Sequence, residues 1–415
     1  MKKFLWLVVL LIGLWEVTAR AQVTVIRAGK LVDPEAGTVA TNQVIIIEGG
    51  KIRAIGARLE IPAGATVIDL SGSTVLPGLF DCHTHMLTTW RPSTGLNPTA
   101  EGLLPTSLRT LQGVVNARGM LESGFTTIRD VGNAPDYSDT SLRSAIESGW
   151  IPGPTIINAG KIITPFGGQW RMRPGRPNVF DTEYIFADTR DEMKRAVREN
   201  IYYGAKVIKI VVNGLGGAYR YSVEDIRYLV EEAARSGFKV AAHCNSDEDA
   251  RNAISGGVAS IEHGEGMTEE TLELAKKAGV VLVGTDFPEG LAKEQGYPAA
   301  MAPQFLARLK RAYKVGAPMA FGTDVLLTTP EKSRGAYALD FLEDYVLVGM
   351  RPAEILRLMT INSARLLGVE KVRGAIRPGM AADIIATPEN PLDNIMALKQ
   401  VSFVMKDGKV FRQNR

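Results

Sequence analysis

The feature that most constrains this chain is a pair of histidines at the end of a short apolar stretch, residues 74–85. Side chains along a strand alternate between its two faces, so His83 and His85 point the same way and Thr84 points the other way. Both imidazoles can then reach one metal ion. A polar strand end would show the same pattern, so the pair alone leaves both interpretations open.

The positions of the other histidines favour the metal interpretation. The chain has only four histidines, and the remaining two, His243 and His263, also close short apolar runs that read as strands. A parallel α/β barrel places its chemistry at the carboxyl ends of its strands. The sequence therefore predicts one site shared by all four histidines.

The middle of the chain alternates strand-like runs with amphipathic helical segments. One such segment starts with a capping box at Ser222 and Asp225 and stops at Gly237, which is typical of a helix on the outside of a parallel sheet. Eight strands close a barrel of this kind. We therefore predict an α/β fold, a (β/α)8 TIM-like barrel, with strands at 74–80, 126–131, 155–159, 207–212, 240–243, 260–263, 280–283 and 319–321.

The two ends of the chain carry similar hairpins. One turns at Gly49 and Gly50 and the other at Asp407 and Gly408. This similarity predicts a small β-sandwich formed by both ends of the mature chain. The expected division is a signal peptide at 1–21, the first part of the β-sandwich at 22–73, a metal-dependent barrel at 74–371 and the second part of the β-sandwich at 372–415.

The first residues have the pattern of a secretory signal peptide. Lys2 and Lys3 precede an apolar run at 4–15, and the sequence Ala-Arg-Ala at 19–21 is a cleavage site that leaves Gln22 first. An uncleaved membrane anchor needs about 20 apolar residues, and Glu16 interrupts this run. We expect a periplasmic or secreted bacterial protein with no stable membrane anchor after cleavage.

Charge and cysteine content add little about partners. A formal net charge of +3 gives no reason to expect nucleic acid or an anionic membrane surface. Cys82 and Cys244, the only cysteines, each stand next to a predicted ligand and so point to the opposite face of their strands. Packing into the barrel wall is the favoured interpretation, and a disulfide is the alternative. The sequence leaves open whether the chain forms a homo-oligomer.

Two further residues fit a metal site. Lys209 is embedded in an apolar run, where an unpaired ammonium would be costly to bury. Asp324 follows the last predicted strand, although a helix-capping role is the alternative. Asp286 stands in a nearly identical motif one strand earlier. We favour Asp324 because it follows the eighth strand.

Together these residues resemble the metal-dependent amidohydrolase superfamily, within it the imidazolonepropionase-like and prolidase-like branch. The resemblance extends to Leu76-Pro77-Gly78 and to residues 360–368 and 376–383. It implies two divalent ions, zinc in the first instance, with a bridging hydroxide as nucleophile and Asp324 as general base and acid. It also implies an N6-carboxylated Lys209 between the ions, in the ligand set His83, His85, Lys209, His243, His263 and Asp324.

Residues that contact the substrate are less evident. Gln169 stands where related enzymes often have a histidine, and Arg220 or Tyr221 could anchor a free α-carboxylate. A solvated loop is the alternative for the last two. We expect an exported hydrolase of an amide or peptide bond acting on a dipeptide or an N-acyl amino acid, a small-molecule substrate. The alternatives are a hydrolase of a cyclic amide or lactone and a non-catalytic binding protein on the same barrel.

Overall fold

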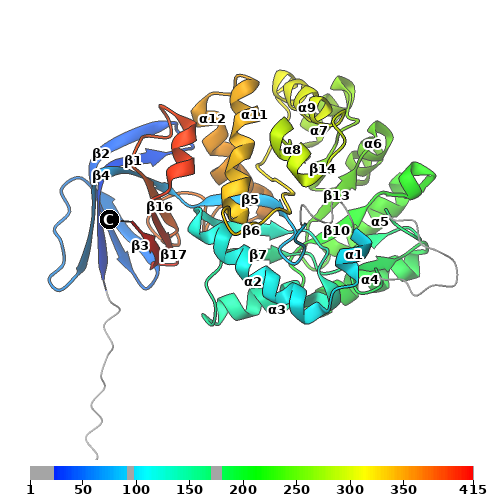
Figure 1. Cartoon of the computed structure of the whole chain (residues 1–415), viewed down its shortest axis with the longest axis horizontal. Coiled ribbons are helices and arrows are strands. Elements are labelled where there is room, and N and C mark those ends of the chain that lie inside the picture. Colours follow the sequence, from blue (N-terminus) through cyan, green and yellow to red (C-terminus); the bar gives the residue numbers. More distant parts are fainter. Residues whose placement is uncertain (1–22, 91–97, 170–179, 415) are drawn as a thin grey trace, which may run out of the picture.

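The computed structural model describes residues 23–90, 98–169 and 180–414 (Figure 1). The predicted signal peptide lies outside these ranges. Among the residues described, no helix is both long enough and apolar enough to cross a membrane.

Both ends of the chain contribute to one seven-stranded sheet, seen at the left of Figure 1. Its strand order is β18-β17-β16-β4-β1-β2-β3. The two predicted hairpins are confirmed: β2 pairs antiparallel with β3, and β17 pairs antiparallel with β18. The strands span Thr24–Asp33 (β1), Thr38–Glu48 (β2), Lys51–Gly56 (β3), Thr66–Pro77 (β4), Ile384–Thr387 (β16), Phe403–Lys406 (β17) and Lys409–Gln413 (β18).

This terminal sheet curls around its own apolar core. Ile52 N donates to Met380 O at 2.8 Å, which ties edge strand β3 to the segment that leads into β16. The enclosed side chains, among them Ile26, Ile45 and Phe403, are almost fully buried. Hydrogen bonds join all these strands into a single sheet, so the two-layer sandwich stays a prediction.

The central domain is the predicted TIM-like barrel. Its parallel strands are β5 (Leu79–Thr84), β6 (Phe125–Asp130), β7 (Thr155–Asn158), β10 (Ile208–Val211), β13 (Val240–Cys244), β14 (Ser260–His263) and β15 (Val281–Val283). Residues 319–321 take the eighth place: Met319 bridges Leu282, and Cys82 N donates to Phe321 O at 2.8 Å. Lys206 N donates to Asn158 O at 2.7 Å and joins β7 to the segment before β10.

The predicted first strand at 74–80 differs from the observed one. Strand β4 continues to Pro77 within the terminal sheet, and barrel strand β5 begins at Leu79. Gly78 lies between them, and a Cβ added there would overlap the side chain of Thr126 on β6. One continuous apolar run thus serves two sheets, and periodicity alone cannot show where the chain passes from one to the other.

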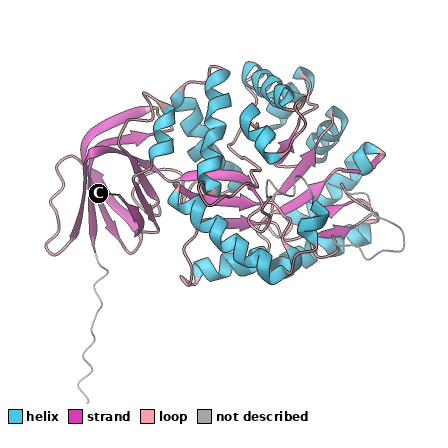
Figure 2. Cartoon of the chain, in the orientation of Figure 1, coloured by secondary structure: helices cyan, strands magenta, loops and turns pink. Residues whose placement is uncertain are grey.

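Helices cover the outside of the barrel (Figure 2). The capping box at Ser222 and Asp225 is confirmed, and a second one forms at Thr189 and Glu192. The helices span Pro98–Gly102 (α1), Thr106–Glu122 (α2), Ser138–Glu147 (α3), Arg190–Tyr202 (α4), Val223–Ala234 (α5), Asp247–Gly256 (α6), Glu269–Ala278 (α7), Glu289–Gln295 (α8), Ala302–Val315 (α9), Arg334–Ala338 (α10), Leu342–Leu347 (α11), Pro352–Arg357 (α12) and Ser363–Leu367 (α13). The shorter strands Ile162–Thr164 (β8) and Tyr184–Phe186 (β9) join the barrel sheet through β10. Asn213–Gly214 (β11) and Tyr219–Arg220 (β12) form a separate two-stranded sheet.

Both cysteines are free and buried, as the packing interpretation predicts. Cys82 packs with Val283 and Ala320, and Cys244 packs with a larger cluster that contains Ile261. Burial raises the pKa of the Cys82 thiol to about 12. Neither thiol therefore has the reactivity of an ionised cysteine near neutral pH.

Candidate active site

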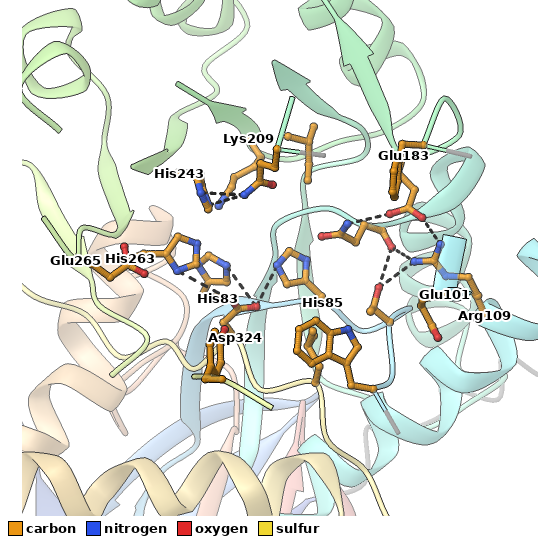
Figure 3. A pocket seen from close by; sticks show the side chains of 18 residues that line it. His83, His85, Glu101, Arg109, Glu183, Lys209, His243, His263, Glu265 and Asp324 are labelled. Atoms are coloured by element: carbon orange, nitrogen blue, oxygen red, sulfur yellow. Dashed lines mark hydrogen bonds and ion pairs between the residues drawn. The ribbon is translucent and has the colours of Figure 1, made fainter. Parts of the chain in front are cut away.

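A cavity of about 320 Å³ opens at the carboxyl ends of the barrel strands (Figure 3). All six predicted ligands line it. His83, Lys209, His243 and His263 lie on β5, β10, β13 and β14, His85 directly follows β5, and Asp324 lies in the segment after residue 321. The cavity wall consists of His83, His85, Thr88, Trp90, Glu101, Arg109, Asn133, Ile162, Gln169, Phe180, Glu183, Lys209, His243, His263, Glu265, Tyr297, Asp324 and Leu326.

Hydrogen bonds at Nδ1 orient three of the histidine rings. His83 Nδ1 donates to Glu262 Oε2 at 2.7 Å, and His85 Nδ1 donates to Gly132 O at 2.8 Å. His263 Nδ1 lies 2.9 Å from Thr285 Oγ1. A partner at one ring nitrogen fixes the tautomer and leaves the other nitrogen free to bind a metal. Each of these three rings can therefore offer its Nε2 atom to a metal ion.

The carboxylate of Asp324 lies among these rings. Its oxygens are 3.4 Å from His85 Nε2, 3.9 Å from His83 Nε2 and 4.0 Å from His263 Nδ1. Ligand atoms of His83, His263 and Asp324 lie within 4.8 Å of one another, close enough to hold one metal ion. Burial raises the pKa of Asp324 above its usual value.

Asp286 has a different place. Its carboxylate forms a buried ion pair with Arg308 and is not part of the cavity wall. The preceding residue, Thr285, contacts His263. Thr285 of this motif thus orients the His263 ring, whereas the Asp286 carboxylate lies outside the cavity wall.

Lys209 is 2% exposed, and its Nζ has no hydrogen-bond partner among the described residues. The same is true of His83 Nε2. Burial lowers the pKa of Lys209 from its usual value, and it lowers the pKa of His85 and of His243 to about 3. Neutral imidazoles are the form that binds metals. Imidazole nitrogens and carboxylate oxygens suit zinc, so the unpaired polar atoms and the donor set fit a divalent metal site.

A buried network around the ligands escaped the sequence analysis. Glu262 accepts from Arg129 Nη2 at 2.7 Å through Oε1 and from His83 through Oε2. Asp81 accepts from His83 N at 3.0 Å and from Thr323 Oγ1 at 2.7 Å. Glu262 is a charged residue inside a buried strand, the same signal that identified Lys209.

The three predicted substrate residues fall in different surroundings. Gln169 lines the cavity, and its Nε2 lies 2.9 Å from His243 Nε2. Arg220 instead pairs with Glu248 and Asp249, and Tyr221 is buried and donates to Ala187 O at 2.7 Å. Neither of these two lines the cavity. The structure therefore gives their predicted role as carboxylate anchors no support.

The cavity wall also contains a buried pair that sequence reasoning missed. Arg109 is 1% exposed and forms an ion pair with Glu183, and Glu183 also accepts from Asn133 Nδ2 at 2.9 Å. These residues are far apart in the sequence, so no local pattern links them. Their opposite charges cancel, so the pair adds polar groups but no net charge to the cavity wall.

Comparison with known proteins gives the class of this site. The Amidohydrolase family profile matches residues 74–411, and the chain belongs to this family. The ochratoxinase of Aspergillus niger is 31% identical over 441 residues, covering 95% of this chain and 88% of that protein. The imidazolonepropionase of Paracoccus denitrificans (strain Pd 1222) is 27% identical over 364 residues, covering 82% and 86% of the two chains.

A solved structure extends this likeness to the fold. The crystal structure of a Xaa-Pro dipeptidase with bound methionine in its active site is 30% identical, with a TM-score of 0.83. The superposition covers 94% of this chain and 100% of that one. The chain is therefore a hydrolase that acts on carbon–nitrogen bonds, and its resemblance to the prolidase-like and imidazolonepropionase-like branch is confirmed.

Proposed function

We propose that the protein is an exported, binuclear metal-dependent hydrolase that cleaves the amide bond of a dipeptide or an N-acyl amino acid. The observation that carries the proposal is the meeting of His83, His85, Lys209, His243, His263 and Asp324 in one cavity. Export rests on the pattern of residues 1–21.

The proposed ligands divide between two ions. His83, His85 and Asp324 would hold one ion, and His243 and His263 the other. Loss of one proton from the Lys209 ammonium would give the neutral amine, and addition of carbon dioxide with loss of a second proton would give an anionic carbamate whose oxygens could hold metal. Two ions held there would polarise the scissile carbonyl and lower the pKa of a bound water toward neutrality.

Asp324 would move the proton. Its carboxylate takes a proton from the attacking water and passes it to the nitrogen of the leaving amine. An amine leaves poorly without that proton, so both transfers serve one bond cleavage. Gln169 lines the same cavity beside His243, so its amide would be available to contact a bound substrate.

The first test combines metal analysis of the mature protein with a hydrolysis panel of dipeptides, N-acyl amino acids, cyclic amides and lactones. We expect about two zinc ions per chain after loading with zinc and bicarbonate. Turnover of the linear amides supports the proposal. Turnover of only the cyclic amides or lactones would favour the alternative function, and metal binding without any turnover would favour a binding protein.

The role of Asp324 has its own test, the substitution Asp324→Asn. It should lower kcat by roughly 10²–10⁴-fold, the usual contribution of a general acid–base group, while the bound metal is largely retained. Asp286→Asn is the comparison, and it should lower stability through Arg308 rather than remove the chemistry. A larger loss of kcat in the Asp286 variant would reverse the assignment of the two carboxylates.

A further inference from the structure

One carboxylate of the cavity wall, Glu265, has no role in the proposed chemistry. The chain turns sharply after β14, where His263 and Gly264 have φ values of 64° and 67°, and the turn brings the Glu265 side chain to the cavity wall. Glu265 Oε2 is buried and has no hydrogen-bond partner among the described residues. A carboxylate oxygen withdrawn from water without a partner is costly. Glu265 is therefore in place to bind a donor that arrives with the substrate.

The cations near Glu265 already have other partners. The guanidinium of Arg308 pairs with the carboxylate of Asp286, and Arg311 reaches only the backbone carbonyl of Glu265, at 3.5 Å. Across the cavity, Arg109 is paired with Glu183. Lys209 belongs to the ligand cluster. Among the described residues, no cation forms an ion pair with Glu265, although Arg308, which lies outside the cavity wall, keeps two unpaired N–H groups.

The surroundings of Glu265 suit a small ammonium group. Figure 3 shows Glu265 on one side of the histidine cluster and the Arg109–Glu183 pair on the other. Tyr297 lines the same cavity, and burial, followed by the charges of Asp324 and Glu265, raises the pKa of its hydroxyl. An aromatic face and a carboxylate together attract an ammonium ion. A substrate cation held there would lie beside the proposed metal centre.

We infer that Glu265 binds the free α-ammonium group of the substrate, so that the enzyme prefers an unblocked dipeptide to an N-acyl amino acid. This inference rests on the proposed amide hydrolysis and narrows its substrate class. A blocked amine carries no charge and cannot compensate the Glu265 carboxylate. Selection between the two substrate types would therefore come from this one side chain.

The test compares kcat/KM for an unblocked dipeptide and for its N-acetyl counterpart, with the zinc-loaded protein. The wild type should prefer the unblocked form. Glu265→Gln should lower that preference by roughly 10–100-fold, the size expected for loss of a charged hydrogen bond, mainly through KM. The N-acetyl substrate should change by less than about threefold, since it makes no such bond. Glu273→Gln, which removes an exposed carboxylate of α7, is the matched control.

Three results would overturn the inference: equal losses on both substrates, a wild-type preference for the N-acetyl form, or an unchanged preference in Glu265→Gln. Melting curves from circular dichroism identify a variant that has merely lost its fold, and Glu265→Asp, which keeps the charge, should retain part of the preference. If the wild type cleaves neither substrate, the proposed hydrolysis fails. In that case, the binding of both compounds to the Asp324→Asn variant can still be measured by calorimetric titration. Tighter binding of the unblocked dipeptide would support an ammonium site at Glu265, and equal binding of the two compounds would refute it.

Discussion

The buried contact between Glu262 and His83 should control metal affinity, and Glu262→Gln tests this. In the wild type both carboxylate oxygens accept hydrogen bonds, one from His83 and the other from Arg129 and Ser260. A glutamine has one acceptor and one NH₂ donor. If its oxygen keeps Arg129, the NH₂ faces His83 Nδ1 and favours the ring tautomer with its proton on Nε2. That proton would occupy the nitrogen that faces the metal site.

Two magnitudes follow from this geometry. Loss of the partner of a metal-binding histidine typically lowers metal affinity by about 10–100-fold, or about 1.4–2.7 kcal/mol. Arg129 is 2% exposed and would also lose the negative charge beside it. Removal of one partner from a buried ion pair typically costs about 3–5 kcal/mol of folding free energy. The Glu262→Gln variant should therefore have both a lower metal affinity and a lower free energy of unfolding than the wild type.

The two effects need separate assays. Competition with a zinc chelator measures metal affinity, and urea unfolding of metal-free protein measures folding free energy. The control is Glu48→Gln, which breaks an exposed pair with Arg53 and should cost less than about 1 kcal/mol without an effect on zinc. Wild-type zinc affinity in Glu262→Gln would refute the claim that Glu262 sets the tautomer of His83. An unchanged unfolding free energy would refute the stated cost of an unpaired Arg129.

Two further substitutions test the packing and the electrostatics of the barrel. Gly78→Ala should lower the free energy of unfolding in urea by about 1–3 kcal/mol, because the new methyl group overlaps Thr126. The control Gly72→Ala, which has open space around it, should change that free energy by less than about 0.5 kcal/mol. Equal effects of the two substitutions would contradict this account. Burial, followed by the charges of Asp286 and Glu343, raises the pKa of Asp344 from 3.8 to about 6. The folded state therefore favours the protonated form of Asp344. The free energy of unfolding should fall as the pH rises from about 4 to 6. Asp344→Asn should remove that fall and be more stable than the wild type at pH 8 by on the order of 1 kcal/mol; identical unfolding curves at pH 4 and pH 8 for both proteins would refute it.

Much of the site could be predicted from sequence because the four histidines and Asp324 lie at or just beyond the carboxyl ends of strands. Strand ends are visible as the last polar residue of an apolar run, and a barrel brings all such ends together. Lys209 was found because a charge inside an apolar run needs a special explanation. The same argument applies to Glu262, but its partners, His83 and Arg129, lie on other strands. A local sequence pattern can therefore identify such a residue, but it cannot identify the residues that the side chain contacts.

The contacts of Arg220 and Tyr221 show what sequence spacing does not reveal. Tyr221 and Arg220 follow a predicted strand end closely, as the ligands do, yet Tyr221 immediately precedes the cap of α5 and its ring packs into the core beneath that helix. Arg220 lies on β12, where its guanidinium meets the first turn of α6. Loop residues take their direction from contacts with neighbouring loops. Sequence spacing therefore places these two residues near the site but does not show that their side chains have other partners.

The backbone at the cavity shows why the ligands do not simply continue their strands. His263, Thr285 and Asp324 all have positive φ values, 64°, 54° and 57°, at three successive strand ends. Each such conformation costs roughly 1–2 kcal/mol for a residue with a Cβ, and it persists only where the surroundings hold it. Hydrogen bonds do this here, since Thr285 contacts His263 and Asp324 N donates to His83 O at 2.8 Å. The sharp turns aim side chains of adjacent strands at a common centre, so the strain is a stability cost that the arrangement of the site requires.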